Sequence, residues 1–271
     1  MNLVLGIDIG GSTTKVVALK DGKPVGMKQV RAGDQVTSLY GAIGHILRTI
    51  GIGLDEVKTF AVTGVGASFV DEQIYGVDTR KVNEFTAIGC GALHLSGLSE
   101  ALVVSMGTGT AFVRAGKDEA ERVGGSGIGG GTIIGLASQM LAKSDIDAII
   151  ALAEKGNLEN VDLMVRDIVG HEIPALSSSL TAANFGKIKS TASDADIALG
   201  IMNMVFQTIG MLAVFVIKND PIKNVVLTGT LATFPHAAPI LLPFSNLADA
   251  EFTIPPNAVF ATALGAALIG D

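Results

Sequence analysis

The sequence is poor in the residue types that form covalent cross-links and soft-metal sites. Cys90 is the single cysteine in 271 residues. This excludes an internal disulfide framework and a multi-cysteine metal or iron–sulfur centre within one chain. The four histidines are scattered and show neither an HxH nor an HxxxH spacing, which argues against a metal site built on imidazoles. We therefore expect Cys90 to be a small buried packing residue.

Basic residues are also in short supply. The chain has 19 Lys and Arg against 26 Asp and Glu, a formal net charge of −7. Nucleic acid or an anionic membrane would need a basic face, so neither is expected as a partner. The stretch MNLVLGIDIGG at residues 1–11 has no basic segment before its apolar run, so no signal peptide is expected. These features predict a cytoplasmic protein.

One uncharged segment could be a membrane span or a core helix. Residues 197–217 carry no charge, and a helix of about 20 apolar residues can cross a bilayer. The segment also contains Asn203 and Gln207, and its flanking residues Asp196 and Lys218 give no basic bias. We predict a buried core or dimer helix of a soluble protein.

Apolar residues (48%) and glycine (34 residues) are abundant. This composition is typical of an α/β enzyme with many tight turns, and the length suits one large domain or two of ordinary size. Apolar runs predict strands, and apolar residues at helical spacing predict helices. The expected strands cover residues 3–9, 14–19, 57–62, 101–106, 111–114 and 224–227, and the expected helices cover residues 36–50, 85–95, 133–141, 197–217 and 258–269. Residues 234–257 hold most of the prolines and predict an irregular excursion.

The strongest local signal is GIDIGGST at residues 6–13, in the turn between the first two expected strands. Glycines let backbone N–H groups approach phosphate oxygens, and hydroxyls add donors to the same anion. The carboxylate of Asp8 stands at a strand end, where it can hold Mg²⁺, usually through water. The alternative is a plain β-hairpin turn with a capping aspartate. The expected phosphate-binding residues are Asp8, Gly10, Gly11, Ser12, Thr13 and Lys15.

A second turn, GTGT at residues 107–110, repeats this design between two further expected strands. Gly10 lies over Gly107 when the two copies are aligned, and Asp8 lies over Ser105, so only the first copy has the carboxylate. A second tight hairpin without a ligand is again the alternative. The duplication predicts two similar lobes that face a cleft, in which a triphosphate is clamped from both sides.

Other segments leave more than one interpretation open. The glycine run at residues 124–132 could be a mobile surface loop, or it could approach a nucleotide at the start of the next helix. Thr230, in the turn after a late strand, could contact adenine or ribose or belong to a bare turn. Glu84 precedes an apolar helix, where a carboxylate is often only a cap. Arg122 adjoins the glycine run and could simply be solvated.

Taken together, these segments closely resemble the type II pantothenate kinases, and they match in order over most of the chain. The matching segments are GIDIGGSTTK at 6–15, NEF at 83–85, MGTGTAF at 106–112, ERVGGSGIGGGTIIGL at 121–136, VDLMVRDIVG at 161–170 and LTAANFGK at 180–187. The motifs ERVGGSGIGGG and LTAANFG are far more specific than the first loop, which many sugar kinases share.

The resemblance implies a two-lobed α/β fold of the actin/hexokinase-like (ribonuclease H-like) type with a central nucleotide cleft. It implies a homodimer that uses the helix near residues 197–217. It also implies Mg²⁺-assisted, ATP-dependent phosphorylation of the terminal hydroxyl of pantothenate, the first step toward coenzyme A. We expect an N-terminal lobe at residues 1–97, a C-terminal lobe at residues 98–257, and a last helix at residues 258–271 that packs back on the first lobe.

The resemblance also assigns roles to residues. Glu84 matches the family's catalytic carboxylate, and Arg122, with Gly124 and Gly125, matches the positions that hold pantothenate. The residues expected at the nucleotide are Asp8, Gly10, Gly11, Ser12, Thr13, Thr14, Lys15, Thr108, Gly109, Gly130, Gly131, Thr132, Ile133, Ile134 and Thr230, with Asp8 also facing Mg²⁺.

Two segments depart from the family pattern. The turn at residues 228–231 reads TGTL where a Gly-Ser-Ser type of sequence is expected, and residues 232–244, a possible partner-chain contribution, contain no tyrosine.

Three other functions fit the architecture. A sugar or alcohol kinase fits the first loop but not the later motifs. An activator of radical dehydratases needs more cysteines than Cys90. A non-catalytic nucleotide or coenzyme A sensor has no need of Asp8, Glu84 and Arg122 together.

Overall fold

A computed structural model describes residues 3–31, 33–70, 73–117, 119–169 and 180–271. Two five-stranded sheets form its framework, and they have the same strand order, β3-β2-β1-β4-β5 and β8-β7-β6-β11-β12. The strands of the first sheet are β1 (Leu3–Ile9), β2 (Thr13–Lys20), β3 (Lys23–Arg31), β4 (Val57–Thr63) and β5 (Asp78–Lys81). Those of the second are β6 (Ala101–Met106), β7 (Thr110–Ala115), β8 (Ala120–Ser126), β11 (Asn224–Thr228) and β12 (Glu251–Thr253).

The two sheets also repeat each other in strand direction. β1 runs antiparallel to β2 and parallel to β4, and β6 runs antiparallel to β7 and parallel to β11. Asp8 pairs with Lys15 in the first hairpin, and Ser105 pairs with Ala111 in the second. The repeat of two strand–turn–strand units predicted from the sequence is therefore confirmed.

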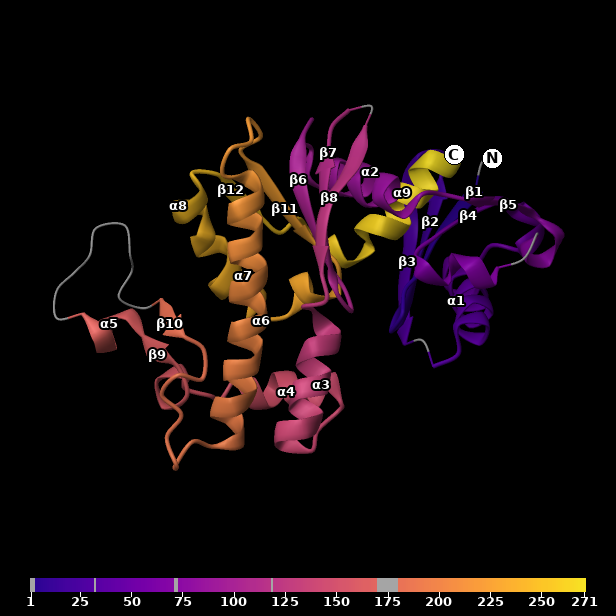
Figure 1. The fold of residues 1–271 in the computed structure, drawn as a ribbon. Coiled ribbons are helices and arrows are strands. Elements are labelled where there is room, and N and C mark those ends of the chain that lie inside the picture. Colours follow the sequence, from indigo (N-terminus) through magenta and orange to yellow (C-terminus); the bar gives the residue numbers. More distant parts are fainter. Residues whose placement is uncertain (1–2, 32, 71–72, 118, 170–179) are drawn as a thin grey trace.

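Helices cover both faces of each sheet, so the molecule is layered (Figure 1). The long helices are α1 (Gln35–Ile50), α2 (Glu84–Ser96), α3 (Gly130–Leu141), α4 (Ile146–Ala153), α6 (Asp194–Ile217) and α9 (Ala261–Gly270). On the first sheet, α1 packs on one face and α9 on the other. On the second sheet, α3, α4 and α6 pack on one face and α2 on the other. We call the first sheet with α1 and α9 the first lobe, and the second sheet with α3, α4 and α6 the second lobe.

Shorter elements complete the chain. They are β9 (Leu163–Met164), α5 (Val165–Ile168), β10 (Thr181–Ala183), α7 (Ala237–Leu241), α8 (Ser245–Ala248) and single turns of 3₁₀ helix at Leu54–Glu56, Val65–Phe69, Ile74–Gly76, Leu158–Asn160, Thr230–Thr233, Leu242–Phe244 and Ala258–Phe260. The motif expected at residues 161–170 falls on β9 and α5, and its last residue, Gly170, lies outside the described residues. The domain boundary between residues 97 and 98 stays a prediction.

The helices α2 and α9 cross between the two sheets, and glycine makes the crossing possible. A Cβ on Gly91 of α2 would lie 1.8 Å from the carbonyl oxygen of Ala261, and a Cβ on Gly265 of α9 would lie 1.9 Å from that of Ala87. Both distances are far below van der Waals contact, so the two backbones approach too closely for any side chain. α2 follows the strands of the first sheet in the chain yet packs on the second, and α9 follows those of the second yet packs on the first.

α6 is the one helix in the described part of the chain that is long and apolar enough to cross a membrane, and 61% of its most apolar window is buried inside the protein. Its polar residues have partners in the interior. Asn203 donates to the carboxylate of the fully buried Asp162 (2.8 Å) and to Thr181 (3.0 Å). These contacts identify α6 as a core helix of the second lobe, which agrees with the buried helix predicted over residues 197–217.

Candidate active site

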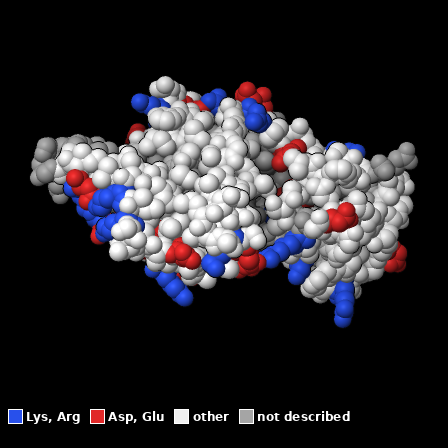
Figure 2. Space-filling view, turned by 60° about the horizontal axis from the view of Figure 1, so that its bottom comes forward, with Lys and Arg blue, Asp and Glu red and all other residues white. Residues whose placement is uncertain are grey.

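A cleft of about 1210 Å³ opens between the two lobes. Figure 2, which brings the lower end of Figure 1 forward, shows a furrow there with acidic and basic side chains beside it. Of the residues predicted from the sequence, those that line the cleft are Asp8, Gly10, Gly11, Ser12, Thr13, Lys15, Glu84, Thr108, Gly109, Arg122, Gly125, Gly130, Ile134 and Thr230. Residues far apart in the sequence thus share one site.

The two glycine turns meet across this cleft. The hydroxyl groups of Ser12 and Thr108 lie 3.0 Å apart and form a hydrogen bond between the lobes. Each turn is closed by a bond of its own: the amide of Gly10 donates to Thr13 O (3.0 Å), and the amide of Gly107 donates to Gly109 O (2.9 Å). The arrangement puts hydroxyl groups and tight turns from both lobes at one point, as a clamp for an anion requires.

Asp8, Lys15 and Glu84 form a charged group at the floor of the cleft. The Lys15 ammonium lies 3.2 Å from Asp8 Oδ2, and these two residues are only 6% and 8% exposed. Glu84 is the first residue of α2, after the capping residue Asn83. Burial raises the pKa of Glu84 above its ordinary value, and the negative charge of Asp8 raises it further, while Lys15 opposes both. A carboxyl group with a raised pKa suits a role as proton acceptor.

The donor set of the cleft fits Mg²⁺ better than a transition metal. No group of three or more His, Cys, Asp or Glu side chains that could hold a metal occurs among the described residues. Mg²⁺ is usually held by one or two carboxylates together with water and substrate phosphates. Asp8, on β1 and in the lining of the cleft, provides a carboxylate of that kind.

Arg122 lies on β8 and also lines the cleft. Its guanidinium carbon is 5.7 Å from the centre of the Phe85 ring, and within the described ranges it has no carboxylate partner. A Cβ on Gly125 would lie 2.5 Å from Arg122 Nη2, so the glycine leaves room for the guanidinium. An unpaired guanidinium in a cleft can bind an anionic or carbonyl group of a ligand.

The glycine run contributes to two elements of the second lobe, β8 and the start of α3. Its first part belongs to β8, and Gly124 pairs with Phe112 there. At the start of α3, the amide of Gly130 donates to Gly107 O and that of Gly131 to Thr108 O, both at 2.9 Å. These amides therefore support the second turn, and in this structure they are not free for an anion.

Five predicted site residues do not line the cleft: Thr14, Gly124, Gly131, Thr132 and Ile133. Thr14 is fully buried and lies on the face of β2 that carries Val16, which packs toward α1. The Thr132 hydroxyl donates to Gly127 O (3.1 Å) and accepts from the Gly129 amide (3.1 Å), and Ile133 is buried in the core of the second lobe. Nucleotide contacts by these residues stay predictions.

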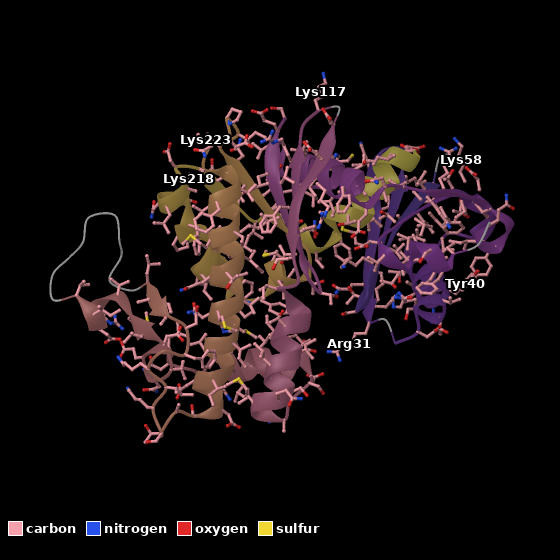
Figure 3. The ribbon with its side chains drawn as sticks, viewed as in Figure 1. Arg31, Tyr40, Lys58, Lys117, Lys218 and Lys223 are labelled. Atoms are coloured by element: carbon pink, nitrogen blue, oxygen red, sulfur yellow. The ribbon has the colours of Figure 1, made fainter. Side chains whose placement is uncertain are left out.

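Several cleft residues were not predicted from the sequence. They are Gln29, Arg31, Ser105, Ser126, Asp145, Asp147 and Thr262, among others. Ser105 could have been found, because it is the counterpart of Asp8 in the repeat. Arg31, at the end of β3, reaches from the first lobe toward the second (Figure 3) and binds Asp145 (3.2 Å) and Asp147 (2.6 Å). No local sequence pattern could reveal these ion pairs, because Arg31 and each of the two aspartates are more than 100 positions apart in the chain.

Apolar side chains of the second lobe line part of the cleft. Thr230 begins a 3₁₀ turn after β11, and Leu231 and Phe234 follow it along the cleft. Ile134 of α3 and Ile150 of α4 line the same cleft. An apolar lining beside the two glycine turns is suited to a flat, uncharged ring such as a nucleotide base.

Comparison with known proteins agrees with this geometry. The model of the Fumble family matches residues 98–237, more than half of the 271-residue chain. The type II pantothenate kinase of Bacillus thuringiensis subsp. konkukian (strain 97-27) is 27% identical over 258 residues, which cover 91% of this chain and 90% of that protein.

Two solved structures show the same architecture. One is the activator of the 2-hydroxyisocaproyl-CoA dehydratase from Clostridium difficile with bound ADPNP, with a TM-score of 0.71, 16% identity, and coverage of 99% of this chain and 94% of that one. The other is a glucokinase of the ROK family from Streptomyces griseus in complex with glucose and AMPPNP, with a TM-score of 0.61, 13% identity and 99% coverage of both chains. At these identities the likeness shows the fold alone, and it confirms the two-lobed actin/hexokinase-like fold implied by the motifs. By its matched residues, the chain belongs to the Fumble family.

Proposed function

We propose that the protein is a pantothenate kinase that transfers the γ-phosphoryl group of ATP to the terminal hydroxyl of pantothenate. One observation carries the proposal: the two glycine turns, the half-buried Glu84 and Arg122, which has no carboxylate partner in the described part of the chain, all line one cleft. The similarity to type II pantothenate kinases over 91% of the chain supports pantothenate as the acceptor.

The chemistry follows from the positions of the charged groups. Glu84 accepts the proton of the acceptor hydroxyl as the hydroxyl oxygen attacks the γ-phosphorus and the bond to the β-phosphate oxygen breaks, which releases ADP. Lys15 and the two glycine turns hold and stabilise the phosphates. When bound, Mg²⁺ offsets negative charge on the phosphates, and Asp8 is the residue that would hold it, through water.

Arg122 gives the cleft a positive charge that is not already paired with a carboxylate of the described residues, unlike Lys15 and Arg31. The formal net charge of −7 does not attract an anionic acceptor. The guanidinium of Arg122 can bind the pantothenate carboxylate or an amide oxygen with two N–H donors. Binding at Arg122 would hold the acceptor with its hydroxyl group near Glu84.

The proposal is tested by measuring ADP release from the purified protein with ATP and Mg²⁺, with and without pantothenate. We expect release that depends on pantothenate and a phosphorylated product of matching mass. Glucose serves as the control acceptor and should not stimulate release. Turnover that is independent of pantothenate, or a complete lack of turnover, would contradict the proposal.

The raised pKa of Glu84 predicts how activity depends on pH. Glu84 can accept a proton only when it is ionised, so kcat/KM for pantothenate should fall as the pH drops through its pKa. Because burial and Asp8 raise that pKa, the fall should begin at a higher pH than for an ordinary glutamate. A pH profile of kcat/KM checks this, with ATP affinity measured in parallel. A midpoint at or below the ordinary glutamate value would exclude Glu84 as the group that titrates.

We further propose a cytoplasmic homodimer. The support is the family resemblance together with two apolar side chains on the outer face of α6, Met211 (38% exposed) and Phe215 (65% exposed), which lie one helical turn apart. Exposed apolar side chains at this spacing suit a helix–helix contact with a second copy. The molecular mass in solution, measured by light scattering, tests the dimer.

A further inference from the structure

Arg122, the proposed binding residue for pantothenate, contacts Phe85, which is the neighbour in the chain of the proposed proton acceptor Glu84. Arg122 belongs to β8, and Phe85 is the residue directly after Glu84 in the first turn of α2. The guanidinium carbon lies 5.7 Å from the ring centre, within the range of about 6 Å over which a cation is attracted by an aromatic face. Among the described residues, this ring is the group that the guanidinium contacts, and no carboxylate pairs with it.

Phe85 is itself held firmly. Its amide donates to the side chain of Asn83 at 3.0 Å, which fixes the start of the helix. Its ring is half-buried and packs against the core cluster that includes Ile88 of the same helix and Val113 of β7. The ring therefore has a fixed position relative to its neighbour in the chain, Glu84.

The backbone at Gly125 limits Arg122 from another direction. A Cβ there would lie 2.5 Å from Nη2, so the guanidinium occupies the space that a side chain would fill. The Arg122 side chain is exposed, so the ring and this backbone are the contacts that can hold its guanidinium in place. Stacking on a ring leaves the in-plane N–H groups of arginine free to bind a carboxylate or carbonyl oxygen.

We propose that Phe85 is a positioning residue, whose ring fixes the Arg122 guanidinium at a set distance from the Glu84 carboxylate. The acceptor is then held by its anionic or amide group at one point while its hydroxyl group lies at the other. This inference rests on the proposed kinase function and adds a residue that acts through Arg122 and does not touch the transferred group.

Steady-state kinetics of Phe85→Leu and Phe85→Tyr test the proposal. Leucine fills much of the space but has no aromatic face, so KM for pantothenate should rise about two- to fivefold, the range of an exposed cation–π contact, with KM for ATP unchanged. Tyrosine keeps the aromatic face, so Phe85→Tyr should have the wild-type KM for pantothenate. Phe69→Leu, which removes a 60% exposed ring outside the cleft, is the matched control and should change neither constant.

A double-mutant cycle separates positioning from a general loss of structure. In an Arg122→Ala background, Phe85→Leu should have almost no further effect on KM for pantothenate, because the group that the ring positions is gone. Equal effects in both backgrounds, or an unchanged KM in Phe85→Leu, would overturn the proposal.

A measurement without substrate keeps this test separate from that of the kinase function. The NMR signals of the Arg122 side chain should show a ring-current shift that disappears in Phe85→Leu and remains in Phe85→Tyr. If the wild-type protein fails to turn over pantothenate, the proposed function fails and the ring-current result still decides the Phe85–Arg122 contact. If turnover occurs and the shift is absent, the contact is wrong and the function stands.

Discussion

Replacing Glu84 by glutamine should lower kcat with pantothenate by at least ~10²-fold, the usual contribution of a general base. Glutamine has nearly the same size and can still occupy the first position of α2, so the fold and the affinity for ATP should be unchanged. The substitution removes only the ability to accept the proton of the acceptor hydroxyl. Single-turnover rates and calorimetric titration with ATP check the two halves of this prediction.

The matched control is Glu251→Gln on β12, which makes the same chemical change at an exposed edge strand outside the cleft. It should have wild-type kinetics. If Glu84→Gln also kept near-wild-type turnover, Glu84 would be only a residue of the helix start, and the proton would have to go to another acceptor. If Glu84→Gln lost ATP affinity, the carboxylate would have a role in the nucleotide site.

Replacing Gly265 by alanine should lower the free energy of unfolding by about 1–3 kcal/mol or more, because the added methyl group would overpack the helix crossing. Its Cβ would lie 1.9 Å from the backbone oxygen of Ala87, and a backbone cannot move aside as a flexible side chain can. Gly91→Ala makes the corresponding clash with Ala261 and should have a similar effect. Urea denaturation of the purified variants gives the measurement.

Gly44→Ala provides the control for this pair. Gly44 is also in a helix, α1, and nothing lies within 4 Å of the Cβ that alanine would add. Alanine has the higher helix propensity, so this variant should be more stable than the wild type by roughly 0.5–1 kcal/mol. A Gly265→Ala protein as stable as Gly44→Ala would show that the two helices can separate without cost, and the close crossing would then not be required for the fold.

The inner strands of both sheets could be predicted from the sequence, and the edge strands could not. The expected strands correspond to β1, β2, β4, β6, β7 and β11, which all lie inside the two sheets. β3, β5, β8 and β12 are the four edges, and none of them was predicted. Inner strands such as β1 are buried along their whole length and need a continuous apolar run, whereas β5 reads DTRK and is largely exposed. Apolar patterning reports burial, so it finds strands that are covered on both sides.

The candidate site also has a part that could be predicted from the sequence and a part that could not. The two glycine turns are local features, and their glycines and hydroxyls were visible in the sequence. Glu84 and Arg122 each had an ordinary structural interpretation, and only the family resemblance gave them roles. The ion pairs of Arg31 with Asp145 and Asp147, and the use of the α3 amides to support the second turn, depend on contacts between segments distant in the chain. Such contacts leave no periodic pattern to detect.

The exchange of α2 and α9 between the sheets has a consequence for how the chain is made. The face of the first sheet that carries Val4, Val17 and Ala61 is covered by α9, so on a ribosome that face stays open to water until the helix at residues 261–270 has left the exit tunnel. This face of β1, β2 and β4 can therefore be covered only after α9, which lies far downstream in the chain, has been synthesised. Neither lobe can complete its core from its own part of the sequence, and a separately expressed N-terminal half should be insoluble for that reason.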